Sequence, residues 1–447
     1  MRHTQILEAS PQNPTGKTVD QDASNIEVDV VIGCLEARNR WTMAQKARSD
    51  ALHSYVDMVI GAVESHAIES EPKAQFILQI LQIILPKLDT FITEEAPEAS
   101  ELARATESLL IVLAQKSSTQ TQSRVLKVIT ERLFQVFRIC LEGIPLAGTS
   151  LELRTLLYSI CSQYLARLMT LDQNEPDQYR KACSSSMDCV RSSSQRLIEI
   201  IADDAEDGTD ICRLHALNLL SLLTALGRSQ KSNHILDNLV KANVIEIMLE
   251  PIRNLTADFV STSVKQRSQL LITTQARAAL LLQISLSRSG AIALLDAGLI
   301  QALRDSNIFR ADPDLGLGPE LDTKPPSTLS TFAPASVASS SNTALFNYFS
   351  LLASILRLLL STFISRGPEN EIISNIVRNF LSEYRANMVG VFKKAAGVNG
   401  VLESKALRDA VGECVRCYTG LVVGCGFVEV EDDGVLADLG RPNGGFT

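Results

Sequence analysis

A helical apolar period runs along most of this chain and limits the folds open to it. Between about Ile26 and Leu303, apolar residues recur at steps of three and four, as in Ile77, Leu81 and Leu88. Several segments are apolar on more than one face, so each helix must be covered on both sides. No segment alternates with the period of two that strands require. The pattern predicts an all-α fold, an α-solenoid of stacked helix pairs of the armadillo or HEAT type.

Short separators rich in proline, glycine or acidic residues divide this period into helices. Pro86 is expected to kink or end the helix that carries Ile77 to Phe91. Other helices are predicted at about 50–66, 100–116, 120–142, 149–171, 175–202, 209–227, 264–288, 344–365, 368–395 and 401–423.

The chain divides into two helical parts joined by a polar stretch. Ser, Thr and Pro fill 13 of the 21 positions from Thr323 to Thr343, too polar a composition to offset the entropy of ordering. We expect one long disordered loop there, inside a helical domain. The predicted organisation is a disordered segment 1–25, a solenoid 26–304, a mobile loop 305–343, closing helices 344–425 and a frayed acidic tail 426–447.

Two short stretches repeat one pattern 55 residues apart. LVKANVIEIML at 239–249 and LLDAGLIQAL at 294–303 both place Ala before Asn or Gly, with apolar residues on either side. Asn and Gly tolerate the left-handed backbone best. Each copy therefore predicts a short helix, a left-handed stop at Asn243 or Gly298, and a new helix turned across the first.

Composition excludes several classes of protein. The net charge of −9, without a cluster of Lys and Arg, argues against direct nucleic-acid binding. The polar N-terminus has no apolar signal core, and nine scattered cysteines indicate reduced thiols in the cytosol or nucleus. Residues 345–364 have the length of a membrane span, but Arg357 and the flanks without anchoring residues favour a buried helix of the stack.

No arrangement of residues predicts catalysis. Cys414 and Cys417 lack a second cysteine pair or a following histidine, so they are interpreted as buried hydrophobes, as are Cys183 and Cys189. GIPLAGTS at 143–150 lacks the lysine of a phosphate loop and predicts a turn between helices. We expect no cofactor, metal or small-molecule substrate. Two further sets are interpreted as non-catalytic, the dispersed histidines at 3, 53, 66, 215 and 234, and a solvated loop of Asp203, Asp204, Glu206, Asp207 and Asp210.

One aromatic stripe is the candidate partner-binding feature. Phe380, Tyr384, Met388 and Phe392 follow each other at steps of four and would share one face of a helix. Such a stripe serves either core packing or contact with a partner. A groove for a partner helix is expected among the helices between 344 and 423.

Two regions resemble a known family. LLDAGLIQALRDSNIFRADPDLGLG at 294–318, and FNYFSLLASILRLLLSTFISRGPENEIISNIVRNFLSEYRANMVGVFKKAAG at 346–397, resemble the C-terminal part of the giant α-solenoid scaffold nucleoporins of the nuclear pore inner ring. The resemblance covers roughly residues 26–425. It is carried also by the order of features: corner helix, acidic segment, polar loop and long apolar helix.

The resemblance implies a non-enzymatic scaffold at the nuclear envelope that supports nucleocytoplasmic transport of protein and RNA. It implies that the C-terminal solenoid docks a segment of another inner-ring nucleoporin. Family members are longer, so this chain would correspond to their last quarter or third and would expose an apolar end face near residue 26. The alternative is a soluble armadillo- or HEAT-like adaptor or transport receptor, for which a ladder of Asn or acidic residues on a concave face would be expected.

Overall fold

The computed structural model describes residues 21–64, 70–115, 123–170, 176–193, 196–255, 264–310, 336–397 and 404–427. Within these residues every regular element is helical, which confirms the all-α prediction. The chain forms two units, residues 1–66 and 67–447. Residues 1–20 of the predicted disordered segment 1–25, most of the polar loop (311–335) and most of the predicted tail (428–447) lie outside the described residues, whereas residues 21–25 are helical, which corrects that part of the prediction.

The helices of both units have the following bounds: α2 Gln21–Glu64, α3 Ser70–Thr93, α4 Glu98–Gln115, α5 Ser123–Gly143, η1 Pro145–Ala147, α6 Leu151–Thr170, α7 Pro176–Ser192, α8 Arg196–Asp207, α9 Asp210–Ser229, α10 His234–Lys241, α11 Val244–Arg253, α13 Val264–Ser285, α14 Arg288–Asp296, α15 Leu299–Asp305, η2 Ile308–Arg310, α16 Ser336–Arg366, α17 Glu371–Glu383, α18 Arg385–Ala395 and α19 Lys405–Cys425.

The first unit is described by one long helix. α2 begins at Gln21, five residues before the predicted start of the solenoid, and runs far beyond the predicted 50–66 segment. Large apolar side chains on its first half are exposed, including those of Val28, Ile32 and Leu35.

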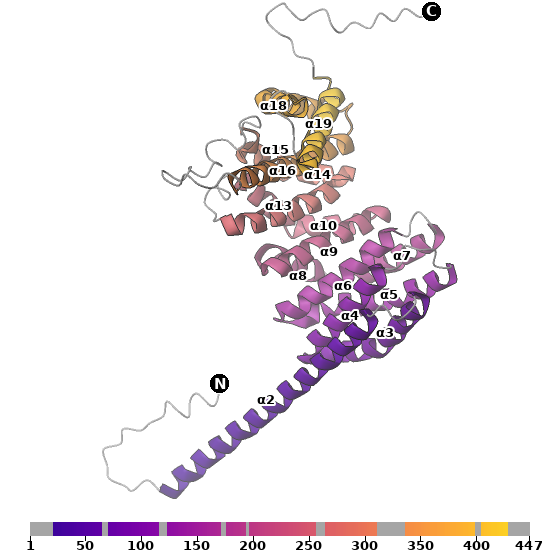
Figure 1. The fold of residues 1–447 in the computed structure, drawn as a ribbon, viewed down its shortest axis with the longest axis vertical. Helices are drawn as coiled ribbons and strands as arrows, with labels where there is room; N and C mark the ends of the chain where they lie inside the picture. Colours follow the sequence, from indigo (N-terminus) through magenta and orange to yellow (C-terminus); the bar gives the residue numbers. More distant parts are fainter. Residues whose placement is uncertain are drawn as a thin grey trace, which may run out of the picture. The chain divides into compact units, whose positions relative to one another are not determined.

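The second unit is a stack built on a central row of long helices. α4, α6, α9, α13, α16 and α19 contact one another consecutively, and the remaining helices cover this row. Figure 1 shows the helices of this unit following one another from α3 to α19. In α6 every residue from Leu157 to Ser162 is buried, because neighbouring helices cover it on opposite sides. This is the packing expected of a solenoid.

In the part of the chain that the structure describes, two helical segments are long and apolar enough to cross a membrane, Leu345–Arg366 of α16 and Lys73–Thr93 of α3. α16 packs between α13 and α19, and 61% of its apolar stretch is buried. Its Arg357 pairs with Glu413 of α19 at 2.5 Å. The helix therefore occupies the place in the stack that the sequence predicted for it.

Several of the predicted helices differ from those observed. α3 continues through Pro86, so the proline does not end it. The helix expected at 175–202 is divided into α7 and α8, and at the end of α7 the Ser192 and Ser193 hydroxyls both donate to the Cys189 carbonyl, at 2.9 and 2.8 Å. The long helix at 344–365 begins earlier, at Ser336.

Candidate functional site

The two predicted corners have the same backbone geometry. Asn243 (φ 58°, ψ 21°) separates α10 from α11, and Gly298 (φ 85°, ψ 32°) separates α14 from α15. The same hydrogen bonds close both turns: Ala242 N donates to Asn238 O at 2.9 Å, and Ala297 N donates to Ala293 O at 3.0 Å. The left-handed stops are therefore confirmed, and α10 and α14 hold equivalent positions in successive layers.

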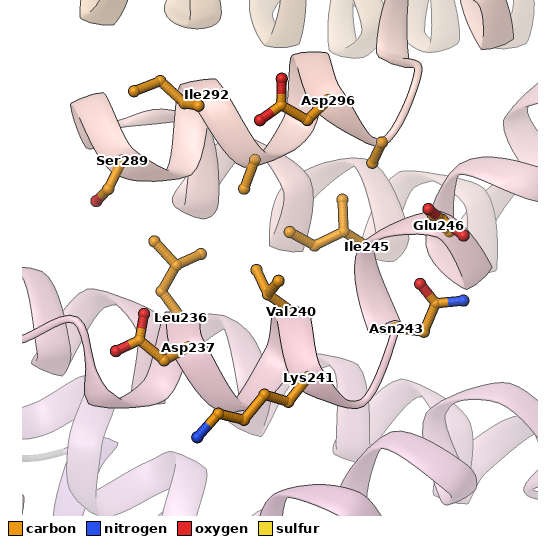
Figure 2. A pocket seen from close by; sticks show the side chains of 12 residues that line it. Leu236, Asp237, Val240, Lys241, Asn243, Ile245, Glu246, Ser289, Ile292 and Asp296 are labelled. Carbon is orange, nitrogen blue, oxygen red and sulfur yellow. The ribbon is translucent and has the colours of Figure 1, made fainter.

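A groove of about 550 Å³ opens between these two short helices. α11 and α15 pack together, whereas α10 rests on α8 and α9, and α14 on α13 and α16. Figure 2 shows Leu236 and Val240 rising from α10 toward α14, with Ile245 beside them. We name this the corner groove; its lining residues are Leu236, Asp237, Val240, Lys241, Asn243, Ile245, Glu246, Ser289, Ile292, Ala293, Asp296 and Ala297.

The apolar side chains of the corner groove are open to solvent. Val240 is 49% exposed and Ile292 is 39% exposed, on facing helices, while Ile245 at 3% forms a buried part of the lining. Water in contact with such surface is released when a partner covers it, at about 25 cal/mol per Å². An open apolar channel of this size between helices is a usual place for a ligand or peptide.

Charge around the corner groove is mainly negative. Asp237, Glu246 and Asp296 supply three carboxylates and Lys241 one ammonium group. All four side chains are exposed, and within the described residues none of them forms an ion pair. The groove therefore presents an apolar floor beside an excess of unpaired negative charge.

A second depression, of about 320 Å³, adjoins the first and shares Leu236 with it. Its lining includes Arg228 and Lys231, so its charge is opposite to that of the corner groove. Arg228 Nη1 donates to the Gln283 carbonyl at 3.3 Å, and burial lowers the pKa of its guanidinium. Ser289 Oγ donates to Asn233 Oδ1 at 3.3 Å, which ties α14 to the residue before α10.

The aromatic stripe does not lie on one helix, which corrects the prediction for 368–395. α17 ends at Glu383, Tyr384 leaves helical geometry (φ −108°, ψ 29°), and α18 begins at Arg385. Phe380, Tyr384 and Met388 are buried and Phe392 is partly exposed.

Aromatic packing holds the residues at this break inside the stack. The ring of Phe309 in η2 contacts those of Phe380 and Tyr384, with centroids 4.9 and 5.3 Å apart. Burial favours core packing over partner contact for Phe380, Tyr384 and Met388, and partner binding by the stripe stays a prediction. Both described depressions lie between residues 224 and 297, so a groove within 344–423 also stays a prediction.

The paired cysteines are buried, as expected for small hydrophobes. Cys414 and Cys417 lie on the inner side of α19, and Cys414 Sγ donates to the Phe349 carbonyl at 3.4 Å. Burial raises the pKa of the Cys417 thiol to about 11 and that of Cys414 further. Cys183 and Cys189 are buried as well. Thiols held protonated in this way are poor nucleophiles.

The acidic cluster at 203–210 is not a solvated loop, which corrects that interpretation. Residues 203–207 belong to α8, and Asp204 is buried where it accepts hydrogen bonds from Arg154 and Tyr158. Residues 143–150 do form the predicted turn between helices, with Gly148 at φ 54°. Among the described residues no three His, Cys, Asp or Glu side chains are grouped to hold a metal ion.

Sequence reasoning identified the two corners but not the corner groove between them. The sequence feature that could have indicated the groove was the repeat itself, because two equivalent corners place two short helices one layer apart. The missing information was the spacing of α10 from α14, which depends on the long helices α9 and α13 beneath them.

Comparisons with known proteins identify a family and a relative to which this chain is similar. Residues 3–423 match the model of the Nup192 family, which is described as the nuclear pore complex scaffold nucleoporins 186/192/205. The chain is also 28% identical, over 488 aligned positions, to Nucleoporin NUP192 of Chaetomium thermophilum. That alignment covers 94% of this chain and 27% of the longer protein, so the chain spans about a quarter of its relative.

Proposed function

We propose, since this chain belongs to the family of the nuclear pore complex scaffold nucleoporins 186/192/205, that it is a structural component of the nuclear pore. The proposal rests on the extent of the family match. The match spans helices α3 to α18 and most of α19. Membership implies a structural role rather than catalysis. It does not favour the alternative of a soluble adaptor or transport receptor.

The stack supports this role physically. A solenoid buries each helix against its neighbours and leaves long flanks for other proteins. Its partners would be other nucleoporins of the inner ring, and its location the nuclear envelope. It would dock a helical or linear segment of such a partner and thereby support nucleocytoplasmic transport.

Localisation in living cells tests the proposal. The chain, fused to a fluorescent protein and expressed in cells of its own organism, is expected to give a stable rim at the nuclear envelope. The fluorescent protein alone serves as the control. A diffuse signal that recovers rapidly after bleaching would instead fit a soluble adaptor and would refute a scaffold role.

Capture of partners from the same cells tests the proposal that the partners are inner-ring nucleoporins. Chemical cross-linking before affinity purification of the fused chain is expected to recover inner-ring nucleoporins above the level of the control. Recovery of transport receptors without nucleoporins would contradict the partner class while leaving family membership intact.

A further inference from the structure

We infer that the corner groove binds a basic, aliphatic segment of a partner protein, an inference that rests on the proposed scaffold function. The segment would carry aliphatic side chains at helical spacing and lysine or arginine beside them. A scaffold family suggests protein partners, and the groove indicates where one of them would bind and by what chemistry.

The shape of the corner groove favours a helix. Its two walls are the short helices α10 and α14, each followed by a left-handed corner, at Asn243 and Gly298, and held one layer apart by the long helices beneath them. An amphipathic helix lays its apolar stripe into such a channel at positions i, i+3 or i+4 and i+7. Val240 and Ile292 line the groove from different walls, so an aliphatic helix seated there would cover apolar surface of both α10 and α14.

The charge of the corner groove decides the composition of the segment. The carboxylates of Asp237, Glu246 and Asp296 outnumber the single ammonium of Lys241, and none is neutralised within the described residues. An acidic segment would be repelled, whereas lysine or arginine beside the apolar stripe would be attracted. The adjoining depression with Arg228 and Lys231 would meet the acidic or C-terminal end of the helix.

A selection from displayed peptides tests the inference without a known partner. The purified chain is exposed to random peptides of about 15 residues, enough for four helical turns. The variant Val240→Glu/Ile292→Glu serves for counter-selection, because these two changes remove the apolar walls. We expect an enriched class with aliphatic residues at helical spacing and flanking Lys or Arg. Enrichment of acidic peptides, or of no class sensitive to the variant, would overturn the inference.

Charge reversal then tests the electrostatic part on the selected peptide. Glu246→Lys/Asp296→Lys should weaken binding by about tenfold or more, and a peptide with its basic residues changed to Glu should recover it. Matched controls are Glu131→Lys/Asp177→Lys, which reverse two exposed carboxylates elsewhere, and Ile83→Glu/Ile211→Glu, which alter two exposed isoleucines. Equal loss in the control variants would refute binding at the groove.

The peptide-binding and localisation experiments together distinguish failure of groove binding from failure of the scaffold function. If the groove is not a binding site, Val240→Glu/Ile292→Glu leaves both the nuclear rim and peptide binding unchanged. If the scaffold function is wrong, the unaltered chain fails to form the rim, whatever peptide it binds. A second copy of this chain as the occupant would appear as dimerisation that the same two changes abolish.

Discussion

Arg154 on α6 and Asp204 on α8 form a two-bond ion pair inside the stack. Arg154 Nε donates to Asp204 Oδ2 at 2.7 Å and Nη2 donates to Oδ1 at 2.9 Å. Tyr158 OH donates to the same carboxylate at 2.6 Å. The aspartate side chain is 8% exposed and the arginine 14%, so this charge pair joins two layers across residues 50 apart in sequence.

Removing Asp204 should therefore destabilise the stack strongly. Asp204→Ala leaves a nearly buried guanidinium and a buried hydroxyl without their acceptor, which costs about 3–5 kcal/mol in the free energy of unfolding. Asp203→Ala, at the exposed neighbouring position, should change stability by less than about 0.5 kcal/mol. Urea denaturation followed by circular dichroism measures both. Equal stability of the two variants would show that the ion pair contributes little.

The corners give a second prediction, based on backbone conformation alone. A Cβ at Gly298 would meet no atom within 4 Å, so Gly298→Ala tests only the left-handed conformation. We expect a loss of about 1–2 kcal/mol. Asn243→Gly removes the same constraint at the equivalent corner and should be neutral within a few tenths of a kcal/mol. Thermal unfolding distinguishes the two, and a neutral Gly298→Ala would contradict the role assigned to the corner.

These corners show which parts of the fold were predictable. Asn243 and Gly298 depend on local chemistry, because the preference of Asn and Gly for left-handed geometry needs no distant partner. The contact of Tyr384 with Phe309, more than 70 positions earlier, could not be predicted from helical periodicity. The burial of Asp204 was equally unpredictable, because nothing near it in the sequence indicates that Arg154 and Tyr158 donate hydrogen bonds to it.

The candidate site was less predictable than the fold. The stripe of Phe380, Tyr384 and Met388 was expected on one helix surface, but aromatic contacts place these residues inside the stack. Val240 and Ile292 resemble ordinary members of an apolar period, and only the spacing between layers leaves them exposed. Periodicity identifies apolar faces, whereas exposure depends on what the neighbouring layer covers.

Close packing between α16 and α19 gives a third prediction. A Cβ at Gly424 would lie 2.5 Å from Phe363 Cε1, whereas one at Gly412 would meet only Arg416 Nη1 at 3.8 Å. Gly424→Ala should cost about 1–2 kcal/mol, since overpacking exceeds the gain in helix propensity. Gly412→Ala on the same helix should instead stabilise the chain by up to about 1 kcal/mol.

The double variant Gly424→Ala/Phe363→Leu provides a check on the cause. If the clash with the ring is responsible, the cost of Gly424→Ala should fall when the ring is absent, which a double-mutant cycle measures as coupling. Additive effects would show that the close approach is not what opposes the alanine.

Thiol reactivity gives a fourth prediction. Cys34 is exposed and the other eight cysteines are buried. Burial raises the pKa of the Cys189 and Cys417 thiols to about 11 and that of Cys140 further. Titration of the native chain with a thiol reagent at mildly alkaline pH should modify one cysteine rapidly, and Cys34→Ser should remove that phase. Rapid modification of Cys414 or Cys417 would contradict their assignment as buried hydrophobes.

The pH dependence of stability tests the contact between α16 and α19. Arg357 Nε donates to Glu413 Oε1 at 2.5 Å, and Arg416 Nε donates to Oε2 at 2.8 Å. The hydrogen bond from Arg357 is the largest cause that lowers the pKa of Glu413 below its ordinary value of 4.5. The unfolded chain therefore takes up this proton at a higher pH than the folded chain. Stabilisation by Glu413 is present above the unfolded pKa and is lost as the pH falls through the folded pKa.

Glu413→Gln isolates that contribution. Arg357 and Arg416 are at least half exposed, so the variant should lose only about 1 kcal/mol at neutral pH. The difference from the unaltered chain should shrink as the pH falls below 4.5, because both chains then carry a neutral side chain at this position. Glu199→Gln, at an exposed position on α8, controls for the removal of one surface charge. Chemical denaturation across this pH range measures the difference, and one that grows toward acid pH would contradict the pairing with Arg357.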